Sequence, residues 1–153
     1  MLTDNRQLAT IFMADTLHLQ IVTPDKQLAS EDVDQVQLPG RNGYLGILPG
    51  HAPLLTELGP GEMSYTQGGQ VNYLAVSWGF AEVLPAKVTI LADAAERPED
   101  IDVKRAQEAK ARADEALRKQ DPELDYEAVL LAQRRAEVRL EVARRAGQTV
   151  GAH

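Results

Sequence analysis

Glycine and proline become scarce near residue 95, and this change constrains the fold more than any other feature of the sequence. Nine of the eleven glycines and six of the eight prolines lie in residues 1–94. Both residue types form turns and interrupt helices. The first part of the 153-residue chain must therefore turn often, whereas the last part is free to form long helices.

The first part has the pattern of short antiparallel strands. Turn residues such as Pro39-Gly40 and Gly68-Gly69 recur about every ten residues. Between them apolar and polar residues alternate, as in residues 17–21. Regular turns with period-two strands predict an antiparallel sandwich or barrel. We expect a tight hairpin at Asn42-Gly43, because both residues tolerate positive φ.

The last part has a helical pattern from Asp100 onward. Small residues recur at spacings of three and four and mark one face of a first helix: Ala106, Ala109, Ala113 and Ala116. Asp121-Pro122-Glu123 predicts a break followed by a new helix, with Asp121 as its N-cap. This second helix is expected to reach about Ala146, before Gly147.

The expected fold class is therefore α+β, an N-terminal antiparallel β-sandwich followed by a C-terminal antiparallel two-helix hairpin. We place the sandwich at residues 16–96 and the hairpin with its tail at residues 97–153. Residues 1–15 are expected to form an N-terminal extension.

Composition excludes several function classes. The chain has no cysteine, which rules out disulfides and cysteine-based metal sites and fits a reducing compartment. A net charge of −7 argues against nucleic-acid binding. No apolar run approaches the roughly 18 residues of a membrane-spanning helix. We expect a soluble, cytoplasmic protein that can associate with a membrane complex.

The three histidines give no sign of catalysis. His18 alternates outward on a predicted strand, His51 lies in a Pro-Gly loop and His153 is the last residue. Their spacing predicts neither a catalytic triad nor a metal site. We therefore expect a protein that is not an enzyme and holds no metal.

Arginines interrupt the apolar stripes of the predicted hairpin. Arg135 takes a position on the inward stripe of the second helix, and Arg139 follows one turn later. Arg105 and Arg112 lie two turns apart on the first helix. Two interpretations remain open: the side chains snorkel over apolar surface, or they gather around an anion such as a polyphosphate. Because the chain lacks G-x-x-x-x-G-K-[ST], any nucleotide site is not a P-loop site.

Three segments closely resemble the epsilon subunit of bacterial F-type rotary ATP synthases. They are residues 43–55 (GYLGILPGHAPLL), 75–83 (AVSWGFAEV) and 88–96 (VTILADAAE). Together with the helical tail, the resemblance covers about residues 16–146 and leaves residues 1–15 unexplained.

The resemblance implies a ten-stranded sandwich, a two-helix hairpin and no catalysis. The sandwich would bind the gamma subunit and the membrane rotor ring of c subunits, and so couple proton flow to ATP synthesis. The extended hairpin would inhibit ATP hydrolysis by reaching the alpha and beta subunits. Its arginines would then face an acidic segment of beta: Arg134, Arg135, Arg139, Arg144 and Arg145. The protein would lie peripherally on the cytoplasmic face of the bacterial plasma membrane.

The resemblance also implies a regulatory ATP site in the folded hairpin, with ATP as a ligand and no other cofactor. Relatives that bind ATP share an Ile/Leu-Asp-x-x-Arg-Ala motif, which residues 101–106 (IDVKRA) match. The implied site residues are Glu96, Ile101, Asp102, Arg105, Ala106, Arg112, Arg135 and Arg139. Asp102 and Glu96 would lie on the adenine or ribose side, and the arginines on the phosphates.

Two positions depart from the family pattern. Tyr44 stands where relatives often carry an acid that faces the rotor ring, and Trp78 stands where they usually have glycine. We expect Tyr44 and His51 as ring contacts, and Trp78 as an interface anchor or as partly exposed packing. An alternative function is a stand-alone β-sandwich adaptor whose hairpin binds a partner helix.

Overall fold

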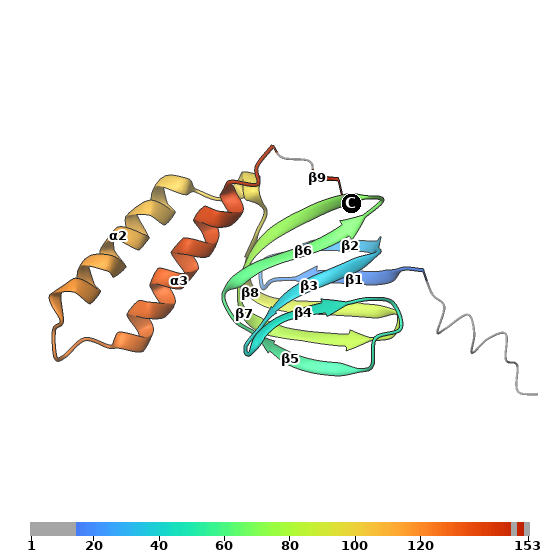
Figure 1. The fold of residues 1–153 in the computed structure, drawn as a ribbon, viewed down its shortest axis with the longest axis horizontal. Helices are drawn as coiled ribbons and strands as arrows, with labels where there is room; N and C mark the ends of the chain where they lie inside the picture. The colour runs from blue at the N-terminus through green and yellow to red at the C-terminus, as the bar shows by residue number, and fades with distance from the viewer. Residues whose placement is uncertain (1–14, 148–149, 152–153) are drawn as a thin grey trace, which may run out of the picture.

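A computed structural model describes residues 15–147 and 150–151 of the chain. A β-sandwich is followed by two antiparallel helices that stand beside it (Figure 1). The predicted extension at residues 1–15 lies outside the described residues except for Asp15. The strands are β1 (Leu17–Val22), β2 (Gln27–Val33), β3 (Gln35–Gly40), β4 (Gly43–Ile47), β5 (Leu54–Leu58), β6 (Gly61–Gln67), β7 (Gln70–Leu84), β8 (Lys87–Glu96) and β9 (Val150–Gly151). The helices are the 3₁₀ turn η1 (Pro98–Asp100), α2 (Val103–Lys119) and α3 (Tyr126–Ala143).

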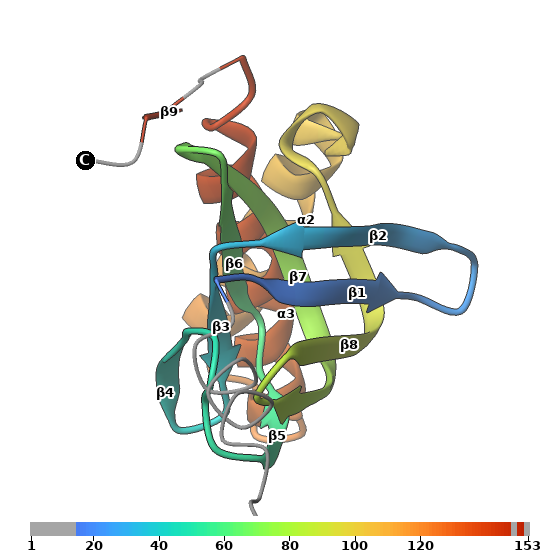
Figure 2. The ribbon, with the colours of Figure 1, turned by 90° about the vertical axis from the view of Figure 1, so that its right-hand side faces the viewer.

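Eight strands, not the expected ten, form the sandwich between residues 17 and 96. One reason for the lower count is that β7 runs unbroken past two partners: residues 70–76 pair with β6, and residues 79–83 pair with β5. Figure 2 shows β1 and β2 crossing the direction of β3 and β6. The sheet is also not wholly antiparallel, since β1 pairs in parallel with β8.

The sandwich encloses one apolar core. The period-two pattern of β1 buries Leu17, Leu19 and Ile21 completely and leaves the residues between them partly exposed. Tyr65 is the largest fully buried side chain, and its hydroxyl accepts a hydrogen bond from Arg97. The members of this core all lie between residues 17 and 95. The sandwich therefore has its own core, independent of the helices.

Two predicted boundaries are wrong by a few residues. The β3–β4 turn is Arg41-Asn42, and Gly43 already begins β4 with φ +134°. Asp125, not Asp121, caps α3 by accepting from the backbone N–H of Ala128. Asp121 instead accepts a hydrogen bond from the backbone N–H of Glu123, which stabilises a turn. Helix α3 begins only after this turn, at Tyr126.

The helices are also shorter than predicted. Because Asp102 caps α2, that helix begins at Val103 and not at Asp100. Helix α3 ends at Ala143, before the predicted Ala146. The short turn η1 (Pro98–Asp100) connects the sandwich to the hairpin.

The hairpin contacts the sandwich through a small surface. Helix α3 packs on β6 and β7. Val138 and Val142 are buried there against Ala75 and Ile101, with Tyr73 at the margin. Between the helices, the predicted small-residue stripe buries Ala106 and Ala113 fully and Ala109 and Ala116 only partly. An attachment this small is consistent with an arm that can detach, since little apolar area is buried.

Candidate functional site: an arginine-lined groove

A groove of about 620 Å³ lies between the hairpin and the bend of β7 and β8. Helix α2 contributes Arg112, and α3 contributes Arg135 and Arg139. The floor consists of small side chains from both helices: Ala109, Ala113, Ala116, Ala128, Val129, Ala132 and Ala136. The sandwich side consists of Ser77, Trp78, Asp93 and Ala94. Three guanidinium groups around one groove of this size suit a polyphosphate ligand.

The predicted arginine cluster is thus brought together in large part. Arg112, Arg135 and Arg139 share the groove, as the anion interpretation requires. Arg105 does not line it but lies one turn before Ala109, which does, on the same face of α2.

The two acidic residues predicted to contact ATP, Glu96 and Asp102, accept hydrogen bonds from other groups of the protein. The carboxylate of Glu96, at the end of β8, accepts a hydrogen bond of 2.6 Å from Nε of Arg139. The carboxylate of Asp102 accepts from the backbone N–H of Arg105 and so caps α2. Neither carboxylate lines the groove.

The two apolar residues of the IDVKRA motif, Ile101 and Ala106, are buried within the protein. Ile101 packs with Val138 and Val142 where the hairpin meets the sandwich, and Ala106 is buried on α2. Their burial explains their residue types without a ligand.

Trp78 borders the groove in a strained conformation that the sequence did not predict. Its φ is +40°, in the left-handed region that glycine adopts without strain. The β7–β8 register pairs Ser77 with Ala94 and Gly79 with Ala92, so that Trp78 lies at the bend between these pairs. A non-glycine residue in such a conformation costs about 1 kcal/mol or more. This backbone geometry gives a physical reason for the glycine usual at this position of the family pattern.

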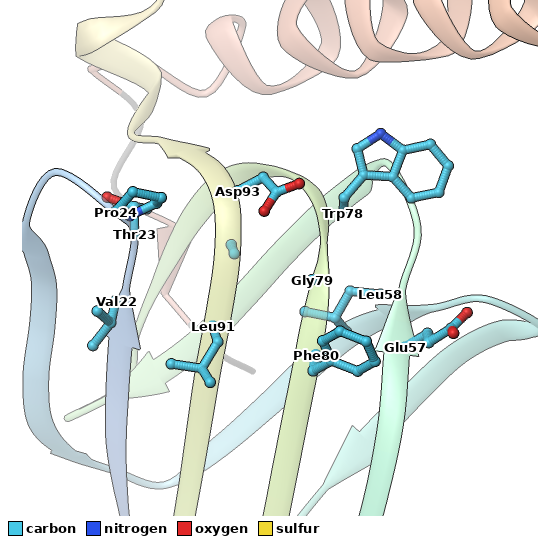
Figure 3. A pocket seen from close by; sticks show the side chains of 11 residues that line it. Val22, Thr23, Pro24, Glu57, Leu58, Trp78, Gly79, Phe80, Leu91 and Asp93 are labelled. Atoms are coloured by element: carbon cyan, nitrogen blue, oxygen red, sulfur yellow. The ribbon is translucent and has the colours of Figure 1, made fainter.

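A second recess, of about 640 Å³, lies on the outer face of the sandwich (Figure 3). Phe80 and Leu91 pair across β7 and β8, Leu91 also pairs with Val22 of β1, and all three line the recess. Phe80 and Leu91 are 51% and 53% exposed, which is high for large apolar side chains. A contiguous exposed apolar surface of this kind is typical of a protein interface.

The two predicted ring contacts lie at opposite ends of β4, Tyr44 near its start and His51 beyond its end. The hydroxyl of Tyr44 accepts a hydrogen bond from the N–H of Glu62, beside Arg144 and Arg145 at the end of the hairpin. His51 follows the other end of β4, and its Nδ1 lies 2.7 Å from the carbonyl oxygen of Ala52. The structure therefore does not bring Tyr44 and His51 together.

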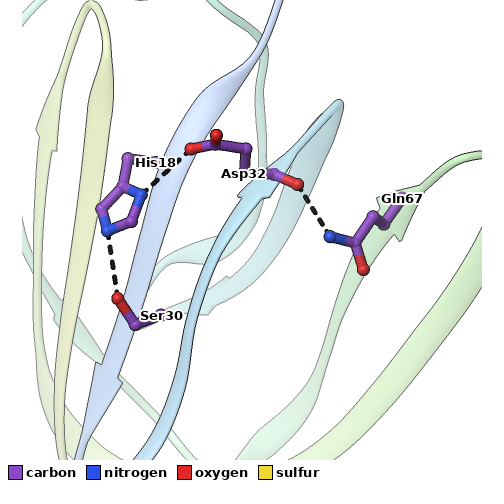
Figure 4. Close-up of polar contacts among 4 residues, drawn as sticks. All are labelled: His18, Ser30, Asp32 and Gln67. Carbon is purple, nitrogen blue, oxygen red and sulfur yellow. Dashed lines mark hydrogen bonds and ion pairs between the residues drawn. The ribbon is translucent and has the colours of Figure 1, made fainter.

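One polar cluster was missed because it depends on strand pairing. Nδ1 of His18 lies 3.0 Å from Oδ1 of Asp32, and Nε2 lies 3.2 Å from Oγ of Ser30, the connectivity of a Ser-His-Asp triad (Figure 4). Strand pairing brings these three side chains together, which the sequence spacing of the histidines does not predict. The register explains it, since His18 of β1 pairs directly with Asp32 of β2.

This cluster lacks the setting that catalysis requires. Ser30 and Asp32 are exposed on the outer side of the β1–β2 pair, and Gln67 donates to the backbone oxygen of Asp32. A triad needs a shielded oxyanion site and a substrate pocket next to the nucleophile. We interpret the cluster as cross-strand polar pairing that fixes the register.

Neither a metal site nor a membrane helix occurs in the described ranges. Within residues 15–147 and 150–151, no three His, Asp or Glu side chains lie close enough to hold a metal ion. Across the same residues, no helix is long and apolar enough to cross a membrane.

Comparison with known proteins identifies the family. Residues 16–98 match the ATP synthase delta/epsilon chain beta-sandwich domain, and residues 99–144 match the long alpha-helix domain of the same chain. The chain belongs to the delta/epsilon chain family of ATP synthase. The matched residues begin at 16 and therefore do not include residues 1–15.

Individual relatives agree with this assignment. The ATP synthase epsilon chain of Koribacter versatilis is 66% identical over 111 residues, which cover 72% of this chain and 78% of the relative. The epsilon chain of Geobacter sulfurreducens is 44% identical over 137 residues, which cover 89% of this chain and 99% of the relative. The recognition of an epsilon chain is confirmed, and with it a non-catalytic subunit.

Solved structures of ATP synthases contain chains with the same fold. A chain of the Euglena gracilis mitochondrial ATP synthase, in a structure of its OSCP, F1 and c-ring, superposes with a TM-score of 0.73 at 26% identity. The match covers 85% of this chain and 82% of that one. A chain of the Tetrahymena thermophila central stalk and c-ring, at 16% identity and a TM-score of 0.54, shares the fold.

Proposed function

We propose that this epsilon chain is a rotor subunit of the central stalk that couples proton translocation to ATP synthesis. In this proposal its hairpin inhibits ATP hydrolysis when it extends toward the alpha and beta subunits, and ATP favours the folded hairpin. One observation carries the proposal: the sandwich has its own core, and the hairpin is attached by a separate small cluster around Val138 and Val142. An arm attached in this way can move without unfolding the sandwich.

In the folded hairpin, two of the arginines that we assign to inhibition are held in ion pairs with the sandwich. Arg139 is bound to Glu96 of β8, and Arg145 is bound to Glu62 of β6. Arg134 is engaged within α3 by Glu137 and Glu141. Extension would release Arg139 and Arg145 from the sandwich, so that an acidic segment of beta could replace the two lost carboxylates.

We assign the outer recess around Phe80 and Leu91 to the gamma subunit. Its apolar surface lies on the sandwich, and Phe80 and Leu91 are not members of the cluster that attaches the hairpin. Gamma could therefore stay bound while the hairpin moves. Phe80→Asp should abolish co-purification with gamma, whereas Thr89→Asp, on the neighbouring strand β8, should have little effect.

Tyr44 and His51 are assigned to the rotor ring as two separate contacts. Since the chain has no cysteine, Tyr44→Cys and His51→Cys each introduce a unique thiol. Disulfide formation with single cysteines in the polar loop of the c subunit tests each contact in the assembled complex. Such a ring contact would hold this chain peripherally on the cytoplasmic face of the plasma membrane.

ATP would bind in the groove with its phosphates on Arg112, Arg135 and Arg139, and Arg105 could reach them from one turn away. A ligand at about 100 times its dissociation constant stabilises the state that binds it by roughly 2.7 kcal/mol. That amount is comparable with the burial of one or two apolar side chains such as Val138 and Val142. ATP could therefore shift the hairpin toward the folded form.

Calorimetric titration of the full chain with ATP tests the regulatory site. Arg112→Ala and Arg135→Ala should each weaken binding at least tenfold. Arg118→Ala is the matched control, because Arg118 lies on the same helix, pairs with Glu115 and does not line the groove. Absence of heat at millimolar ATP, or equal affinity in all variants, contradicts the site.

Truncation tests the inhibitory role. A chain that ends after Glu96 keeps every residue of the sandwich core and should still bind gamma. ATP hydrolysis by the assembled complex should be faster than with the full chain. Equal hydrolysis rates contradict inhibition by the hairpin.

A further inference from the structure

The edge of β7 that faces β8 is open beyond the end of β8. Glu96, the last residue of β8, pairs with Ala75, so residues 70–74 of β7 extend past the partner strand on that side. Strand β6 covers the opposite edge, since it pairs with β7 from Gln70 to Val76. An uncovered strand edge presents unpaired N–H and C=O groups and can bind a further strand.

The C-terminal strand β9 occupies this edge of β7 (Figure 1). Val150 pairs with Val71, and Gly151 pairs with Gln70, in an antiparallel arrangement. An extended peptide often binds to an open sheet edge in this way, because main-chain hydrogen bonds hold it there. Here the added segment comes from the same chain, a few residues after the end of α3.

The register determines which residue of β9 faces β7 with its backbone groups. The backbone oxygen of Thr66 on β6 accepts from the N–H of Asp34, so the backbone groups of Thr66 point away from β7. Thr66 pairs with Val71, and in such a pair the backbone groups of both residues point outward, which directs those of Val71 away from β6 and toward β9. Val71 and Val150 therefore face each other with their N–H and C=O groups. Because these directions alternate along a strand, the N–H of Gly151 points away from β7.

Strand β9 ties the end of α3 to the sandwich. Gly147 follows the turn after α3, has a left-handed φ of +74° and lies three residues before Val150. Three residues span at most roughly 11 Å. While β9 is paired, this end of the hairpin stays within that reach of β7, in addition to the contacts of Arg145 with Glu62 and Tyr73. The hairpin can move farther from the sandwich only after β9 separates from β7.

We propose that β9 is a strap that holds the folded hairpin on the sandwich by adding a strand to the open edge of β7. The pairing lies beyond residue 144, where the matched helix domain ends, and it adds to the attachment around Val138 and Val142. Release of β9 is then a step in the extension of the hairpin. The strap can be tested on the full chain alone, whereas its effect on ATP hydrolysis rests on the proposed inhibition by the extended hairpin.

Two proline substitutions one residue apart test the strap in the full chain. Val150→Pro removes the N–H that faces Val71, whereas Gly151→Pro removes an N–H that points away from β7. Hydrogen exchange of α3 amides should become about three- to tenfold faster in Val150→Pro, as expected for the loss of one backbone hydrogen bond. Exchange in Gly151→Pro should stay close to that of the unaltered chain. Amides of β1, in the sandwich core, should exchange equally in all three chains.

Each outcome supports or overturns the strap. Equal α3 exchange in the three chains overturns it, because β9 would then add nothing to the attachment. Equal acceleration in both variants also overturns it, because the effect would not follow the register of β9 on β7. In the assembled synthase, Val150→Pro should also slow ATP hydrolysis by favouring the extended hairpin. Faster α3 exchange without slower hydrolysis supports the strap and contradicts the proposed inhibition.

Discussion

Nε of Arg139 in α3 lies 2.6 Å from Oε1 of Glu96 at the end of β8. Both side chains are partly exposed, so the pair is only partly screened by water. It joins the hairpin to the sandwich next to the groove, and Arg139 also lines that groove. The same arginine can therefore hold the hairpin without a ligand and contact phosphate when one is bound.

Glu96→Gln should loosen the hairpin while leaving the sandwich intact. A partly exposed ion pair contributes up to about 1 kcal/mol, so opening of the hairpin should become roughly two- to fivefold more frequent. Hydrogen exchange of α3 amides measures this change. Glu57→Gln is the control, because its partner Arg41 lies within the sandwich. Equal exchange rates of α3 in both variants would refute the role of Glu96.

Arg145 should contribute a second attachment at the end of α3. Its guanidinium donates to both carboxylate oxygens of Glu62, at 3.3 and 3.4 Å, and lies 4.3 Å from the centre of the Tyr73 ring. Ion pairing and cation–π contact each contribute roughly 0.5–1 kcal/mol at partly exposed sites. Arg145→Ala should therefore expose α3 to proteolysis severalfold faster, as limited digestion followed over time would show.

The neighbouring Arg144→Ala is the matched control for this contact. Arg144 is exposed, and no ion pair to it within 4 Å is found among residues 15–147 and 150–151. Its replacement should leave the digestion rate unchanged. If Arg144→Ala accelerates cleavage as much as Arg145→Ala, general loss of positive charge explains the effect and the specific contact with Glu62 does not.

Acid should loosen the two helices from each other through Asp114. Its carboxylate accepts hydrogen bonds of 2.7 Å from Lys110 on α2 and from Gln133 on α3. The hydrogen bond from Lys110, and then that from Gln133, lower the pKa of Asp114 below the usual 3.8. A carboxyl with a lowered pKa stabilises the fold above its unfolded-state pKa, and this stabilisation disappears as pH falls through the folded-state value.

Asp114→Asn should therefore reduce the acid sensitivity of the hairpin. Circular dichroism at 222 nm, followed from pH 6 to pH 2, should show less acid-induced loss of helix relative to pH 6 in the variant than in the unaltered chain. Glu108→Gln, on the exposed side of the same helix, is the control. A pH profile unchanged by Asp114→Asn would show that other carboxyl groups govern acid unfolding.

The sequence predicted the two architectures because each depends on local pattern. Gly and Pro spacing defined the sandwich, and the alanine stripe defined α2. The cap of α3 was misplaced because Asp121 and Asp125 are both competent acceptors, and the choice between them depends on how the turn closes. Local propensity cannot make that choice.

The sequence predicted the arginines of the candidate site but not the sandwich residues that line it. Arg112, Arg135 and Arg139 follow from helical spacing and the family motif. Trp78 and Asp93 join them only through the β7–β8 register, and the pairing of His18 with Asp32 depends on register in the same way. The register between strands that are distant in sequence depends on the pairing of the whole sheet, and this pairing cannot be read from a single sequence.

Gly79 should be the least replaceable glycine in the sandwich. Its φ is +149°, and a Cβ placed there would lie 2.0 Å from the carbonyl oxygen of Leu91 on β8. Because that neighbour is backbone in a central strand pair, it cannot rotate away. Gly79→Ala should lower the free energy of unfolding by roughly 2 kcal/mol or more, with the midpoint of urea unfolding as the measurement. Gly46→Ala is the control, since a Cβ at that position would meet no atom within 4 Å, and its midpoint should change little. Similar midpoints for the two variants would mean that β7 and β8 can separate at the bend, and that Trp78 is not held rigidly beside the groove.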